Sequence, residues 1–142
     1  MVIKQISVIL VNVPGALSIV SETLGREGVN IRAVSVADTS DISTVRFVVD
    51  DPVKAMNMLK ANGFSVRETD VLAVETPDHP GGLNAVLRPL RNAGINVHYL
   101  YPHLGRVSGQ AIVILGVDRT KEAEEILQQN WVKTLGAEAY SI

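Results

Sequence analysis

The chain lacks cysteine and has few aromatic residues, and each shortage narrows what it can be. Its 142 residues contain no cysteine, one Trp, three Tyr and two Phe. Without thiols, the protein forms no disulfide bonds, uses no thiolate nucleophile and has no cysteine-ligated metal site.

The chain also lacks a surplus of one charge and a long apolar run. Thirteen basic residues stand against fifteen acidic ones, and they form no basic cluster of the kind that binds nucleic acid. The apolar runs are as short as strands and cannot span a membrane, and the start does not read as a signal peptide. We therefore expect a cytoplasmic protein that binds neither nucleic acid nor membrane.

What the chain does contain is an internal repeat. Sliding the sequence by 66 positions gives seven identities in the 22 positions from 10 to 31, including Pro14 with Pro80, Gly28 with Gly94 and Asn30 with Asn96. Similarity at a fixed spacing predicts a duplicated folding unit. The mean hydropathy of +0.21 is high for so small a chain. We therefore expect apolar surface to be buried between copies or subunits, as in a homodimer.

Each copy has the same predicted order of elements. A β-rich run at 3–11 precedes a Pro-Gly break and a helical pattern. Strands at 31–36 and 44–49, a helix opened by Asp50-Asp51-Pro52 and a short strand at 64–67 follow. In the second copy, the strands are expected at 97–101, 111–117 and 131–135, with a helix opened by Asp118. This βαββαβ order predicts an α+β protein of two ferredoxin-like units, residues 1–69 and 70–142, each with an antiparallel sheet and helices on one face. Residues 68–70 would link them.

The phrases NVPGAL at 12–17 and GVNI at 28–31 strongly resemble an ACT domain, a regulatory module of amino-acid metabolism. The first copy is similar to the ACT part of acetolactate synthase small subunits, and the second copy repeats the marks as PGGL and GINV. Because the copies fill nearly the whole chain, the resemblance implies a stand-alone tandem ACT protein without a catalytic domain or cofactor.

The resemblance also implies where a ligand binds. ACT domains usually bind an amino acid where the loop between the first strand and first helix of one copy faces a neighbouring copy. A glycine turn into a helix leaves backbone N–H groups that suit a carboxylate, and an asparagine offers a donor and an acceptor. The candidate ligand-binding residues are Asn12, Pro14, Gly15, Ala16, Leu17, Asn30 and Ile31, and in the second copy Asp78, His79, Gly81, Gly82, Leu83, Asn96 and Val97.

Two details of the sequence limit what the resemblance implies about the ligand. Asn12 and Asn30 match two asparagines of phosphoglycerate-dehydrogenase-type ACT domains, but Leu10 stands where those domains have a histidine, so the same ligand is not implied. Asp78 replaces the first asparagine in the second copy, where it would disfavour a carboxylate and suit an ammonium. Apolar and aromatic residues near the second loop suggest an apolar or aromatic amino acid.

Simpler interpretations stand beside these. Asn30 and Asn96 fit turns that tolerate unusual backbone angles. The histidines at 79, 98 and 103 show no spacing typical of a metal site. Tyr99 and Tyr101 share one face of a strand, where they either pack or line a ligand pocket. Pro89 removes one helical hydrogen bond and is expected to kink its helix.

Three functions follow from these patterns. The first is a non-enzymatic amino-acid sensor that acts by population shift. The second is a ligand-independent dimerisation module, or a regulatory subunit that docks on a separate metabolic enzyme. The third, an enzyme, has no nucleophile elbow, P-loop or HExxH motif to support it.

Overall fold

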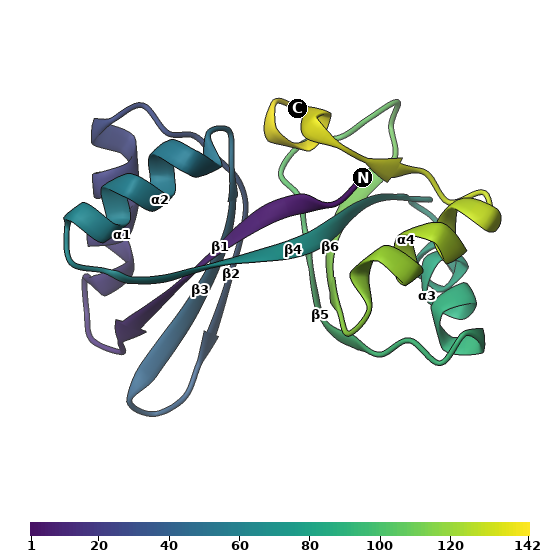
Figure 1. Ribbon diagram of the computed structural model, residues 1–142, viewed down its shortest axis with the longest axis horizontal. Coiled ribbons are helices and arrows are strands. Elements are labelled where there is room, and N and C mark those ends of the chain that lie inside the picture. The colour runs from purple at the N-terminus through teal and green to yellow at the C-terminus, as the bar shows by residue number, and fades with distance from the viewer. The chain divides into compact units, whose positions relative to one another are not determined.

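The computed structural model describes all residues from 1 to 142, which divide into two compact units. Lys4–Thr69 forms one unit, the first copy, and Asp70–Ile142 with Met1–Ile3 forms the other, the second copy. Figure 1 shows both units with most of their helices and strands labelled.

The first copy contains β1 (Ile3–Val11), α1 (Ala16–Arg26), β2 (Ile31–Asp38), β3 (Ile42–Val49), α2 (Pro52–Ala61) and the start of β4 (Ser65–Thr76). The strands lie in the order β2-β3-β1-β4, and β3 runs antiparallel to both β1 and β2. Apolar residues at helical spacing on α1 and α2 meet alternate residues of β1 and β3 in one core. Its buried members include Val8, Leu24, Phe47 and Leu59. The helices therefore cover a single face of the sheet, as in a ferredoxin-like unit.

The second copy repeats this arrangement with the latter part of β4, α3 (Gly82–Asn92), β5 (Val97–Pro102), β6 (Ala111–Val117), α4 (Thr120–Gln129) and β7 (Thr134–Leu135). Its strand order is β5-β6-β4, with β7 on the other side of β4. A short 3₁₀ helix, η1 (Ala137–Tyr140), follows. The core between helices and sheet contains Leu72, Val86, Leu90 and Leu127. Both copies thus have the predicted α+β architecture.

Two local predictions were wrong. The expected linker at 68–70 lies inside β4, which runs unbroken from Ser65 to Thr76. Those residues are polar because they lie at accessible positions of a strand, where Glu68 pairs with Lys4 at 3.8 Å, and no Gly or Pro interrupts them. Asp118 does not cap α4, because the N-cap is Arg119.

One other boundary differs from the prediction. The last expected strand, 131–135, shortens to β7, Thr134–Leu135, because Trp131 turns the chain with a φ of 63°. Pro89 lies within α3, which remains one helix over Gly82–Asn92.

Tyr99 and Tyr101 stack on each other with ring centroids 6.3 Å apart. Tyr101 is buried, which agrees with a packing role.

Candidate functional site

The two strand-to-helix loops end in nearly the same backbone conformation. Gly15 caps α1 with φ 85° and ψ −10°, and Gly81 caps α3 with φ 85° and ψ −5°. This left-handed conformation is easy for glycine and costly for residues with a Cβ. Neither helix has a side-chain cap or an acidic residue in its first turn. The Ala16 N–H already donates to the Val13 carbonyl at 3.3 Å, and the Gly82 N–H donates to the His79 carbonyl at 2.9 Å. The next N–H groups, those of Leu17 and Ser18 in α1 and of Leu83 and Asn84 in α3, are the ones able to bind an anion.

In the first copy, Asn12 fixes the loop to the neighbouring hairpin. Its backbone N–H donates to the Asp41 carbonyl at 2.9 Å, and its side-chain Nδ2 donates to the Thr39 carbonyl at 3.1 Å. The side-chain oxygen remains as an acceptor. Beside it, Val13 and Leu17 are 54% and 42% exposed. This loop thus offers helix N–H groups and apolar side chains close together along the chain.

The second loop is built differently. Arg106 donates to Asp78 Oδ2 at 3.1 Å and, through its other terminal nitrogen, to the Gly109 carbonyl at 3.0 Å. The Asp78 carboxylate, which was expected to hold an ammonium, therefore already has a cationic partner. The ring nitrogen Nδ1 of His79 lies 2.9 Å from the carbonyl oxygen of Pro80.

Gly82 is the tightest point of the second loop. It is buried, and a Cβ added there would lie 1.9 Å from the carbonyl oxygen of Pro77. The first copy has Ala16 at this position. Gly82 therefore allows two backbone segments to approach each other, and the two loops are not equivalent. The remaining loop candidates have similar exposure in the two copies. Pro14 and Pro80 are both exposed, and Leu83 is 41% exposed, against 42% for Leu17.

The asparagine of the Gly-x-Asn segment in each copy, Asn30 or Asn96, exchanges hydrogen bonds with an aspartate. The Asn30 N–H donates to Asp50 Oδ1 at 2.9 Å, and the Asp50 N–H returns a bond to the Asn30 carbonyl at 3.0 Å. Asn96 and Asp118 repeat the exchange at 3.2 Å in both directions. The sequence pattern placed both aspartates only at the starts of helices. An aspartate follows the third strand in both copies, and this recurrence was the signal in the sequence for the asparagine–aspartate pair.

In each copy, the strand-to-helix loop and the Gly-x-Asn asparagine lie at opposite ends of the sheet. Asn12 bonds to Asp41, just before β3, whereas Asn30 bonds to Asp50, just after β3. The eight residues of β3 separate them, which is roughly 25 Å at the usual rise of a strand. Asn96 lies likewise at the Asp118 end of β6. Ile31 packs against the core of the first copy, and Val97 against that of the second. No single unit therefore brings all the candidates to one amino acid.

The three histidines do not form a metal site. Nε2 of His103 lies 2.8 Å from the Ala139 carbonyl, and its Nδ1 accepts the Gly105 N–H at 2.8 Å. Nδ1 of His98 is 3.4 Å from Asn96 Nδ2. No group of three or more His, Asp or Glu residues in the chain is placed to hold a metal ion.

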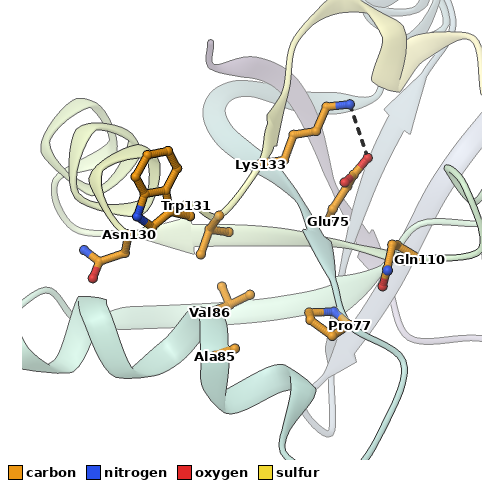
Figure 2. A pocket seen from close by; sticks show the side chains of 9 residues that line it. Glu75, Pro77, Ala85, Val86, Gln110, Asn130, Trp131 and Lys133 are labelled. Atoms are coloured by element: carbon orange, nitrogen blue, oxygen red, sulfur yellow. Dashed lines mark ion pairs between the residues drawn. The ribbon is translucent and has the colours of Figure 1, made fainter.

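A cavity of about 250 Å³ opens in the second copy beside the second loop, and none of the candidate residues lines it (Figure 2). Its lining comes from the end of β4, the first half of α3, Gln110 just before β6 and the turn between α4 and β7. It includes Glu75, Pro77, Val86, Trp131 and Lys133. Two further hollows include candidates, one with Asn96 and Val97 and one with Gly81. The sequence pattern gave no sign of the cavity in Figure 2, because its lining residues are far apart in the chain.

Comparison with known families now identifies the module. Residues 1–140 match the family model described as an ACT domain pair. The chain belongs to this family. No curated protein matches it by sequence. In this ACT pair, no helix has the length and apolar character needed to cross a membrane.

Solved structures agree with this assignment. The ACT pair is 34% identical to protein BT0572 from Bacteroides thetaiotaomicron, with a TM-score of 0.93 over 100% of this chain and 98% of that one. The ligand-free regulatory subunit of aspartate kinase from Thermus thermophilus is 16% identical, with a TM-score of 0.65 over 90% and 92%. The corresponding subunit from Thermus flavus is 15% identical, with a TM-score of 0.60 over 90% and 92%. At these identities the two kinase subunits show a shared fold alone.

Proposed function

We propose that the protein is a non-enzymatic amino-acid sensor whose ligand binds at a junction of ACT copies, near the first strand-to-helix loops. The observation that carries this proposal is the pair of glycine-capped helix starts, Gly15 and Gly81, with the same left-handed conformation and no side-chain cap. Helix N–H groups and the positive end of the helix dipole favour a ligand carboxylate. Membership of the ACT pair family supports an amino acid as the ligand.

The first loop is the better carboxylate site of the two. Its Asn12 is neutral and keeps a side-chain oxygen available, whereas the second loop carries the Asp78–Arg106 ion pair. The exposed side chains of Val13 and Leu17 favour an apolar ligand.

A junction explains why the candidates lie so far apart within one unit. A loop and a Gly-x-Asn turn can contact one amino acid only if they belong to different copies, in the same chain or in two chains. A ligand that contacts two copies stabilises the arrangement in which both contacts exist, so its output is a population shift. A homodimer would provide further junctions of this kind.

Thermal unfolding in the presence of each of the twenty amino acids tests the proposal. A ligand at a hundred times its Kd stabilises the folded state by about 2.7 kcal/mol, which raises the melting temperature by several degrees. We expect one amino acid, or a few related ones, to do this, and Asn30→Ala to abolish the shift. Only the backbone of Asn30 is engaged within the unit, so the variant should fold normally. The matched control is Asn57→Ala on the exposed face of α2, which should respond as the parent does.

A second function, a ligand-independent dimerisation module or docking subunit for a metabolic enzyme, is favoured by a different observation. Ile9, Val11, Val36 and Ile42 are 43 to 65% exposed on the strands of the first copy, and exposed apolar residues on a sheet favour association. This function predicts that light scattering shows the same assembly with and without amino acids. It also predicts no effect of Asn12→Ala or Asn30→Ala. A flat thermal response to all twenty amino acids would favour this function over the sensor.

A further inference from the structure

Trp131 occupies a position where the first copy has glycine. In the first copy, Gly63 ends α2 with φ 82°, and the N–H groups of Gly63 and Phe64 bond back to the carbonyls of Lys60 and Leu59 at 3.0 Å. Trp131 ends α4 in the same way with φ 63°, and its N–H bonds to the Gln128 carbonyl at 3.1 Å. The turn needs a left-handed residue, which glycine provides without strain.

The tryptophan is therefore not explained by the turn. A bulky residue in the left-handed region is strained, and this side chain is 95% exposed, so burial does not offset the strain. Such strain is typically found where a side chain serves a site. Trp131 lines the cavity that Figure 2 shows, together with Val132 and with Val86 of α3.

The same cavity holds a carboxylate that lacks a hydrogen bond. The side chain of Glu75 is only 17% exposed, and its Oε1 is buried without a hydrogen-bond partner. Lys133 Nζ lies 3.6 Å from that oxygen, too far for a good hydrogen bond. The two residues are neighbours because the Glu75 N–H donates to the Lys133 carbonyl at 2.9 Å. Lys133 is 62% exposed and can reorient.

The first copy provides an internal comparison for these three residues. Ile9, Ser65 and Gly63 occupy the positions that correspond to Glu75, Lys133 and Trp131, at offsets of 66, 68 and 68. The indole and both charges thus occur together only in the second copy.

From these features we infer a second ligand site in the Glu75–Trp131–Lys133 cavity, for the zwitterion of an α-amino acid with an apolar side chain. Its ammonium would donate to the buried oxygen of Glu75, and its carboxylate would pair with Lys133. Its side chain would lie against the apolar lining, namely Pro77, Val86, Val132 and the indole. Paired charges of opposite sign disfavour a lone amine or a lone acid, because each would leave one charge repelled.

The size of the cavity suits such a ligand. It measures about 250 Å³, whereas a buried apolar cavity of about 150 Å³ already accepts benzene. The site lies within one copy, and none of the residues of the proposed loop site lines it.

The emission of the single tryptophan provides a direct test with the whole chain. We expect leucine at up to millimolar concentration to shift Trp131 emission to the blue in a saturable way. Leucine analogues that lack the carboxylate (isoamylamine) or the amine (4-methylpentanoate) should bind about tenfold more weakly or worse, as loss of a charged pair implies. No saturable response to leucine, valine, isoleucine or methionine would overturn the site. An equal response to isoamylamine would overturn its assignment to a zwitterion.

Variants identify the residues and separate this site from the loop site. Glu75→Gln keeps the shape of the side chain and should weaken binding about tenfold or more. Trp131→Gly copies the first copy and should therefore fold, and calorimetry should show weaker leucine binding. Asn30→Ala should leave the emission response unchanged. A response lost in Asn30→Ala but retained in Glu75→Gln would refute this cavity site and leave the proposed sensor standing. The reverse pattern would support the cavity site even if the loop site binds nothing.

Discussion

Substituting Gly82 with alanine tests the closest backbone contact in the second copy. The added Cβ would lie 1.9 Å from the carbonyl oxygen of Pro77 and 2.8 Å from its carbonyl carbon. Ordinary contact begins near 3.4 Å, so the carbonyl would have to move by about 1.5 Å. Both obstructing atoms belong to the backbone, and the proline ring restricts how that backbone can turn.

The expected cost is at the upper end of the range for overpacking, about 3 kcal/mol. For a chain of this length, that loss lowers the melting temperature by roughly 10 °C. Urea unfolding followed by far-ultraviolet circular dichroism measures the change in free energy. The control is Ala16→Gly at the equivalent position of the first copy, which should cost about 1 kcal/mol or less. If Gly82→Ala were no more destabilising than this control, the Pro77 carbonyl would not rest against Gly82, and the loop geometry described above would be wrong.

Three further predictions concern the second copy. Gly116→Ala should displace the Tyr99 ring, whose nearest atom lies 2.2 Å from the added Cβ, and reduce the near-ultraviolet circular dichroism. An unchanged spectrum would refute the contact. His103→Ala should leave the Ala139 carbonyl without its buried partner and destabilise the protein by about 2 kcal/mol. Amide exchange should then rise at the C-terminal 3₁₀ helix rather than in α3. Hydrogen bonds, first that from its own backbone N–H, hold the pKa of Glu138 below its ordinary value. Its contribution to stability is therefore present above the ordinary glutamate pKa and lost as the pH falls through the lowered value. Glu138→Gln should flatten the acid limb of a stability profile, and an identical limb would contradict this.

The two copies share a fold but differ at their loops and cavities. The first copy has Asn12 beside its glycine-capped helix. The second copy closes its loop with the Asp78–Arg106 pair and the tight Gly82 contact, yet only it contains the Glu75–Trp131–Lys133 cavity. Duplication leaves one copy free to keep a site while the other acquires a different one. The proposed sensor and the proposed cavity site follow this division.

The sequence by itself determined the features that depend on local geometry. The repeat predicted two βαββαβ units, because apolar spacing distinguishes helices from strands. The glycines at 15 and 81 were expected at turns into helices, and both have a positive φ. These features depend on residues near one another in the chain, so the sequence pattern is sufficient to predict them.

Only the tertiary structure decided what depends on partners distant in the chain. It made residues 68–70 part of β4, which runs unbroken through them and is hydrogen-bonded to β1. It gave Asp50 and Asp118 their asparagine partners and placed Asn12 and Asn30 at opposite ends of a sheet. It also brought Glu75, 56 residues before Trp131, to the same cavity. Strand pairing and packing set these distances, and neither follows from hydrophobic spacing within one segment.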